Sequence, residues 1–192
     1  MNTVTHVIVA NALLSKPGQS KRNWMVMIGA LLPDASIFFL YFWAKIIQQI
    51  PERSIWRDVY WQEPWQTIGA ISNSIPIALV LLCLGFIRGY PLLVVLAFAM
   101  LSHFLLDFPV HADDAHQHFW PLTNWRFHSP FSYWDSAHHA ASVAILELSI
   151  ILLCSVVLWQ RFKHWAVRIG VIVIILMFFG TYFYFAIALR RF

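Results

Sequence analysis

The sequence predicts an all-α protein, a polytopic bundle of membrane helices that forms one integral membrane domain over residues 1–192. The chain is 60% hydrophobic and only 11% charged, and its mean hydropathy of +0.66 is too high for a soluble domain of this size. Apolar runs near the spanning length of about 20 residues alternate with short basic turns. All ten tryptophans lie near the ends of these runs or in the connections, as in an interfacial aromatic belt.

The first apolar segment, Thr5 to Leu14, is too short to cross a hydrocarbon core of about 30 Å. We expect a half-membrane helix that packs on its neighbours. The first six residues lack the basic region of a signal peptide, so insertion is expected to rely on the spans. A basic turn, Lys16 to Arg22, leads into the first full span, Trp24 to Trp43. Pro33 removes a helix hydrogen bond inside this span, so we expect a break next to Asp34.

Residues 45–66 are polar but rich in aromatic side chains, and apolar side chains recur there at four-residue spacing, as in Ile55 and Val59. This pattern is typical of an amphipathic helix that lies in the membrane interface. Including the first full span, the sequence predicts about five spans in addition to the short N-terminal helix and the interfacial helix. The remaining spans are Thr67 to Phe86, Pro91 to Phe108, His139 to Trp159, and a last one that follows Arg168 and reaches Leu189.

The orientation follows from the basic residues in the connections, which are more frequent on the cytoplasmic side of membrane proteins. One face of the predicted topology holds Lys16, Lys21, Arg22, Arg88, Arg161, Lys163 and Arg168. The other holds Lys45, Arg53, Arg57, Arg126, Arg190 and Arg191, together with most of the acidic residues. We assign the first face to the cytoplasm. The formal net charge of +4 fits contact with membrane lipid and indicates no nucleic-acid partner.

Two pairs of ionisable residues are expected to converge inside the bundle. His103 and Asp107 lie four residues apart, on one face of a helix, and such residues within a membrane-length apolar run are functional by default. His6 and Asp34 each lie about ten residues from the basic turn, so a hairpin would place them at one depth. Two histidines with two carboxylates suit zinc, or alternatively manganese or iron, with an open position for water. Such a site would make the protein a hydrolase.

Each of these residues also has a purely structural interpretation. His6 could be a core histidine with satisfied hydrogen bonds, Asp34 could bind backbone groups freed by the break, and His103 with Asp107 could form a simple hydrogen-bonded pair. The long connection after the third span holds further candidates, because loops of that length are often functional. The possible additional ligands are His111, Asp113, His116, His118, His139 and the intramembrane Glu147, which could instead pair with a neighbouring span.

Four short motifs follow one another in the order found in a known family. They are Thr5-His6, Leu31-Leu32-Pro33-Asp34, the run Leu101 to Asp107 (LSHFLLD), and Trp120-Pro121. The chain, up to about Asp135, resembles the small bacterial inner-membrane proteins called membrane-bound metal-dependent hydrolases, whose relatives are sometimes labelled cobalamin biosynthesis proteins. The resemblance implies that His6, Asp34, His103 and Asp107 are metal ligands, and we expect the last three to be catalytic as well. It further implies a distant likeness to zinc-dependent, helical enzymes of the phospholipase C type.

The chain departs from this family before the second span. Family members usually carry a motif of the form His-Arg-Gly-x-Thr-His-Ser there, whereas residues 66–74 of this chain contain no histidine and include Asn73. This removes two ligands that the resemblance would imply. The residues that could replace them come from the outer loop: His111, His116, His118, His138 or His139.

The leading functional hypothesis is a membrane-embedded, metal-dependent hydrolase of a lipid-linked or amphiphilic ester, with Arg126 binding anionic charge on the substrate. The site would face the periplasmic side of a bacterial inner membrane. The alternative is a non-catalytic membrane subunit or assembly factor that docks a membrane-protein partner through the outer loop 109–138, whose aromatic content is typical of an interface. A proton path through Asp34, Glu147, His103 and Asp107 is a third interpretation, although the absence of an internal repeat disfavours a transporter.

Overall fold

The computed structural model describes the backbone of residues 1–188 and the side chains of residues 1–184, and within that part it is helical, without a strand. This confirms the predicted all-α fold. The α-helices are α1 (Thr3–Leu14), α2 (Ser20–Leu31), α3 (Ala35–Tyr41), α4 (Glu52–Ser54), α5 (Glu63–Ser72), α6 (Ile75–Ile87), α7 (Pro91–Asp107), α8 (Ala140–Arg161) and α9 (Trp165–Ala188). Two π-helical segments, η1 (Phe42–Ile47) and η2 (Ile55–Val59), and a 3-10 turn, η3 (Ser136–His138), complete the order.

Three helical segments of the described chain are long and apolar enough to cross a membrane: Glu63–Ile87, Ala140–Arg161 and Trp165–Tyr184. The pair Ser20–Leu31 and Ala35–Ile47 makes a fourth if it is counted as one bent span. This is fewer than the five spans that the sequence predicts. The difference is α7, whose 17 residues cover about 25 Å at 1.5 Å per residue, less than the hydrocarbon core. The predicted end of the last span, Leu189, and the basic pair after it lie outside the described residues.

The break at Pro33 is confirmed. Helix α2 ends at Leu31 and α3 begins at Ala35, and the two segments meet at 61°. Proline lacks the amide hydrogen that would continue the helix, so the chain turns and leaves Asp34 at the elbow. Asp34 therefore lies where a side chain can face the interior of the bundle rather than lipid.

The stretch from residue 45 to 66 differs from the single interfacial helix that the sequence predicts. It consists of η1, the short α4, η2 and the start of α5, with Gln49 in a left-handed conformation at φ 54° and Pro51 after it. These two residues end η1 and turn the chain back on itself. Ile55 and Val59 do share one buried face, as their spacing predicts, but that face packs on Leu40 and Ala44.

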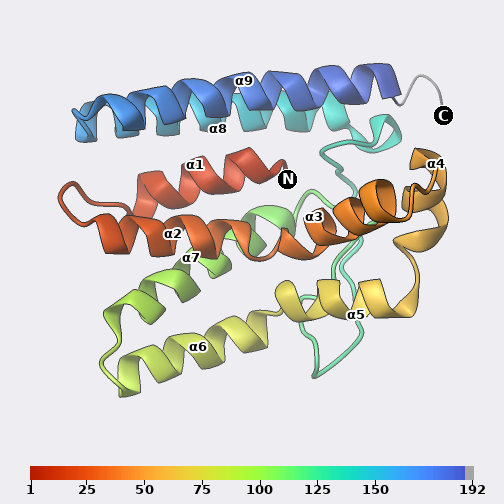
Figure 1. Cartoon of the computed structure of the whole chain (residues 1–192), viewed down its shortest axis with the longest axis horizontal. Helices are drawn as coiled ribbons and strands as arrows, with labels where there is room; N and C mark the ends of the chain where they lie inside the picture. The colour runs from red at the N-terminus through yellow and green to blue at the C-terminus, as the bar shows by residue number, and fades with distance from the viewer. Residues whose placement is uncertain (189–192) are drawn as a thin grey trace.

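Helix α1 lies in the middle of the bundle. Figure 1 shows it between α2 on one side and the adjacent pair α8 and α9 on the other. Its apolar side chains, Val4, Ile8 and Ala12 among them, form a buried cluster with Ile151 of α8 and Phe178 of α9. The other helices thus cover this short helix, as expected for a half-membrane segment, and its first turn lies against the end of α7.

Candidate metal centre

The last turns of α7 carry the first part of the site. His103 and Asp107 are four residues apart and therefore share a helix face, and the distance from His103 Nε2 to Asp107 Oδ2 is 3.0 Å. Helix α7 crosses α2 closely, because a Cβ on Gly29 would lie only 2.5 Å from the carbonyl oxygen of Leu96. The missing side chain lets the two helices approach, and this brings His103 into contact with the end of α2.

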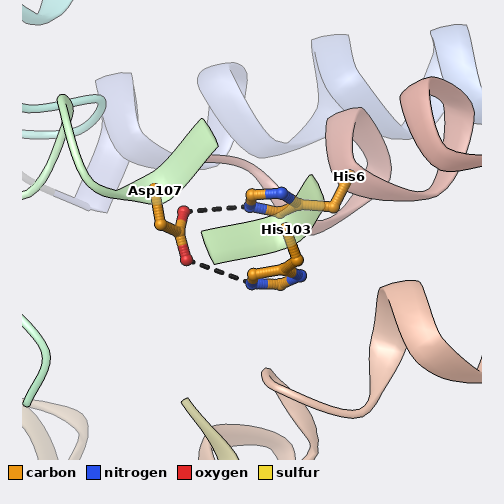
Figure 2. Close-up of side chains that lie close together, drawn as sticks. All are labelled: His6, His103 and Asp107. Carbon is orange, nitrogen blue, oxygen red and sulfur yellow. Dashed lines mark ion pairs between the residues drawn. The ribbon is translucent and has the colours of Figure 1, made fainter. Parts of the chain in front are cut away.

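Helix α1 supplies the second imidazole. His6 Nε2 lies 3.0 Å from Asp107 Oδ1, and the rings of His6 and His103 stack with centroids 3.5 Å apart and an interplanar angle of 11°. Figure 2 shows the two rings one above the other, both facing the carboxylate of Asp107. All three residues are buried, so one carboxylate faces two imidazoles in a site closed to bulk solvent.

The hydrogen bonds around these imidazoles leave nitrogen lone pairs available. His103 Nδ1 lies 2.8 Å from the carbonyl oxygen of Ala30, in the last turn of α2. A carbonyl only accepts, so Nδ1 donates and the neutral ring has its lone pair on Nε2. Within the described residues, His103 Nε2 and both ring nitrogens of His6 are buried and form no hydrogen bond, although both Nε2 atoms reach 3.0 Å from Asp107. Buried nitrogens that lie close to a carboxylate without a hydrogen bond are compatible with a cation as the missing partner.

The residues present therefore fit a metal ion. The ligand atoms of His6, His103 and Asp107 all lie within 4.8 Å of one another. In a tetrahedral zinc site with bonds of about 2.1 Å the ligand atoms are about 3.4 Å apart, so the three ligand atoms can surround one ion once the stacked rings of His6 and His103 tilt and their in-plane lone pairs converge. Three protein ligands with one open position are also the ligand number of catalytic zinc sites.

Asp34, the fourth predicted ligand, lies beside this group. Its Oδ1 is 3.5 Å from His103 Nε2, and its Oδ2 accepts a hydrogen bond of 2.5 Å from the hydroxyl of Thr3. The hairpin of α1 and α2 does bring its carboxylate close to the histidines, as the depth of the two residues predicts. Asp34 also lines the large cavity described below, so it stands between that cavity and the buried ligands.

A second group of possible ligands shares Asp107. The ligand atoms of Asp107, His111 and His116 also lie within 4.8 Å of one another. His111 Nε2 is 3.2 Å from Asp107 Oδ1, and its Nδ1 lies 3.0 Å from Asp114 Oδ2. The indole nitrogen of Trp134 donates to the same Asp114 oxygen at 2.9 Å. Asp114 thus orients the ring of His111, as carboxylates do for metal-binding histidines.

The amino group of Met1 contacts this second group. Its nitrogen lies 2.5 Å from Asp107 Oδ1 and 3.0 Å from His111 Nε2. The carboxylate of Asp107 therefore has two groups that can carry positive charge beside it, the amino group of Met1 and the imidazole of His111.

The ionisation of the loop residues reflects these charges. Burial and the amino group of Met1 favour neutral His111, but the carboxylates of Asp114 and Asp107 outweigh them and raise the pKa of its imidazole to about 9. For His116 burial and the neighbouring His111 outweigh the attraction of the carboxylates, and they lower the pKa of its imidazole to about 3. Burial opposes ionisation of Asp114, yet His111 holds the pKa of its carboxyl far below the usual value.

A cavity of about 500 Å³ opens beside the loop histidines of the second group, within the usual range for small-molecule sites. Asp34, His111 and His116 line it. Aromatic residues from the folded-back segment line it as well: Trp56, Tyr60, Trp61 and Trp65. The arginines Arg53, Arg57 and Arg126 also line it. The cavity therefore combines apolar walls with cationic side chains next to the candidate ligands.

Of the other predicted site residues, two line the cavity and two lie elsewhere in the loop. Arg126 lines the cavity and donates to the carbonyl oxygen of Ala115 at 2.5 Å and to Gln66 Oε1 at 2.9 Å. Asp113 also lines the cavity but is exposed, whereas His139 is exposed at the end of the loop. His118 is buried, and its Nδ1 bonds the backbone oxygen of Asn73 at 3.0 Å.

Glu147 lies apart from both ligand groups. It is buried in α8 and accepts hydrogen bonds from the backbone nitrogen of Asn2 at 2.8 Å and from the hydroxyl of Tyr182 at 2.7 Å. These contacts hold α8 against α1 and α9. They match the alternative interpretation, in which Glu147 pairs with neighbouring helices.

Two residues of the site were not among the predicted candidates. Thr3 positions Asp34, and Asp114 orients His111. The three-residue spacing of His111 and Asp114 is a signal that could have indicated their contact. No comparable sequence pattern connects Thr3 to Asp34, because the two come together only through the packing of α1 on the elbow.

Comparison with known proteins gives no relative from which a function could be inferred. No protein-family model matches the chain, and searches of curated proteins and of solved structures found no match. A functional assignment must therefore rest on the geometry and chemistry of the site.

Proposed function

We propose that this chain is a membrane-embedded, metal-dependent hydrolase that cleaves an ester, in particular a phosphoester, of a lipid-linked or amphiphilic substrate. The observation that carries the proposal is the buried group of His6, His103 and Asp107, whose ligand atoms lie within 4.8 Å of one another. Burying two imidazoles and a carboxylate is costly unless a partner compensates. A divalent ion, zinc or alternatively manganese or iron, provides such a partner.

The proposed chemistry divides between the ligands and the neighbouring side chains. A divalent ion at this position lowers the pKa of a coordinated water and polarises a phosphoryl or carbonyl oxygen. Asp34 is then the general base: its Oδ1 lies 3.5 Å from His103 Nε2, and it faces the cavity from which substrate and water arrive. The hydrogen bond from Thr3 holds this carboxylate in place.

The cavity suits an amphiphilic anion. Trp56, Trp61 and Trp65 provide flat apolar surface for the lipid part of the substrate. Arg126 is fixed by two hydrogen bonds, and its guanidinium binds the phosphate or carboxylate charge. This orientation would place the ester on the side of the cavity lined by Asp34.

The proposed location is a bacterial inner membrane, with the cavity on the periplasmic side. The apolar helices fit a membrane protein, and large apolar side chains are exposed along them, such as Leu153 at 68% and Leu176 at 64%. The side is proposed from the basic residues of the turns near Lys16, Arg88 and Arg161. A substrate would then enter from the outer leaflet.

The test is metal analysis and hydrolysis with the full-length protein in mild detergent. We expect a stoichiometric transition metal, and release of nitrophenol from bis(p-nitrophenyl) phosphate that a chelator abolishes and zinc restores. His103→Ala and Asp107→Ala should each lose bound metal and at least about 100-fold in rate, since they remove ligands. The controls are His164→Ala and Asp58→Ala, which change exposed residues outside the site. A protein without bound metal, or ligand variants with wild-type metal content and rate, would contradict the proposal.

A second candidate function has support from the surface of the outer loop. Leu122 is 78% exposed, Trp125 52% and Phe131 45%, and apolar side chains of this kind are typical of interfaces with another protein. In this alternative, loop 109–138 docks a membrane subunit and the chain is not catalytic. Extraction of native membranes in gentle detergent distinguishes the two: a stable complex that Leu122→Ser and Trp125→Ser disrupt would favour docking, and a solitary monomer would exclude it.

A further inference from the structure

We infer that the centre holds two metal ions, with the carboxylate of Asp107 bridging them. This deepens the proposed function and rests on its first ion, at His6, His103 and Asp107. The second ion would bind Asp107, His111 and His116, whose ligand atoms also lie within 4.8 Å of one another. Paired metal ions about 3.5–4 Å apart are common in enzymes that hydrolyse phosphoesters.

The position of Asp107 favours a bridge. Its Oδ1 lies 3.0 Å from His6 Nε2 and 3.2 Å from His111 Nε2, whereas its Oδ2 lies 3.0 Å from His103 Nε2. Histidines from α1, from α7 and from the loop thus all approach this one carboxylate. A carboxylate has two oxygens with two lone pairs each, which is enough for two ions.

The orientation of His111 also suits a ligand. Its Nδ1 contacts the carboxylate of Asp114 at 3.0 Å, and Asp114 is itself held by Trp134. With Nδ1 donating to Asp114, a bound ion would replace the proton on Nε2, the nitrogen that faces Asp107. This is the arrangement in which an outer carboxylate fixes the tautomer of a metal-binding histidine.

His116 completes the group from the cavity side. Its ring centroid lies 4.7 Å from that of His111, and it lines the cavity. His6, His103 and Asp107 are not among the residues that line this cavity. The second ion would therefore lie nearer the cavity than the buried ion, and both could contact a substrate that reaches past Asp34.

Carboxylates and one amino group surround the proposed second position. Two further carboxylates, Asp34 and Asp114, lie next to the ligand histidines, and the amino group of Met1 already contacts Asp107 and His111. Buried carboxylates need compensating charge. The amino group of Met1 is thus the competing occupant of this position, and the number of bound ions distinguishes the two.

The test is a count of ions per chain. The metal-free, full-length protein in detergent is titrated with Zn²⁺ alone, dialysed and measured by elemental analysis. We expect two ions per chain in the wild type, one in His116→Ala, one in His6→Ala and none in Asp107→Ala. The last result is the signature of a bridge, because one substitution removes both ions. His139→Asn is the matched control, since asparagine tolerates the left-handed conformation of that exposed residue, and it should keep two.

A further variant and a stability measurement separate loss of an ion from loss of folding, and the rate of hydrolysis separates the paired centre from the proposed function. His116→Gln retains the side-chain volume without an imidazole and should also bind one ion, and thermal melting in detergent shows whether each variant is folded. One ion in the wild type, or one ion retained by folded Asp107→Ala, would overturn the inference. One ion together with hydrolysis would leave the proposed function standing, whereas two ions without hydrolysis would support the paired centre and contradict the hydrolase.

Discussion

The two candidate ligand groups share Asp107 but are built in different ways. His6 and His103 are fixed by the crossing of helices, with their rings stacked 3.5 Å apart and fully buried. His111 and His116 come from the loop after α7, and there the orientation depends on polar contacts such as the one with Asp114. Helix packing therefore holds one group by shape, and hydrogen bonds hold the other. The geometry of the first group should therefore be lost when helix packing is disturbed. The geometry of the second should be lost when a single polar contact is removed.

The largest effect is expected where the helices cross. Gly29→Leu places a side chain where even a Cβ would lie 2.5 Å from the Leu96 oxygen and 2.8 Å from the Ala99 Cβ. Separation of α2 from α7 moves His103 away from Ala30 and Asp34, so the buried group should be lost. Gly29→Ala should destabilise the protein by about 1–3 kcal/mol, and Gly29→Leu by more, measured by thermal melting and ion count in detergent.

The control for this substitution is Gly170→Ala in α9. A Cβ at that position meets no other atom within 4 Å, and alanine is the better helix former by about 1 kcal/mol. Gly170→Ala should keep or slightly raise the melting temperature and keep the metal content. If Gly29→Leu also kept the wild-type melting temperature and metal content, the close crossing of α2 and α7 would not determine the geometry of the buried group.

The difference between the two groups also explains what could be predicted from the sequence. Helical spacing fixes which side chains share a face, so His103 and Asp107 could be paired directly. The break at Pro33 and the hairpin depth of His6 follow from proline chemistry and from a rise of 1.5 Å per residue. These arguments need only the local geometry of a helix, and the structure brings the four residues together accordingly.

The loop and the folded-back segment could not be derived in this way. Residues 45–66 have amphipathic spacing, but Gln49 and Pro51 turn the chain, and the aromatic residues line a cavity instead of lying flat in the interface. His111 and His116 were only two among several loop candidates, because loop conformation depends on contacts that are distant in sequence. Asp114 was not among the candidates, although its bond to His111 orients that ring.

An intermediate effect is expected at Asp114. Asp114→Asn keeps the shape of the side chain but removes the charge opposite His111 Nδ1, 3.0 Å away. Loss of such an outer contact typically weakens metal affinity about 10–100-fold, so the second ion should bind more weakly while the buried ion is unaffected. Competition with a chromogenic chelator measures both affinities.

The neighbouring Asp113 is the matched control for that measurement. It is exposed, so Asp113→Asn changes the same formal charge without changing the support of His111. Equal weakening in both variants would mean that charge near the loop matters and orientation does not. Weakening of the buried ion in Asp114→Asn would mean that the two groups are not held independently.

The smallest effect is expected at Arg126, which touches neither ligand group. Its guanidinium has five N–H donors and donates to Ala115 and Gln66, so donors remain for an anion in the cavity that Arg126 lines. Arg126→Gln should raise KM for an anionic phosphodiester about tenfold, equivalent to about 1.4 kcal/mol, and leave the ion count unchanged. Arg88→Gln, in the exposed turn between α6 and α7, should leave KM unchanged. An unchanged KM in Arg126→Gln would remove this arginine from substrate binding, whereas loss of an ion would show that it supports the loop ligands instead.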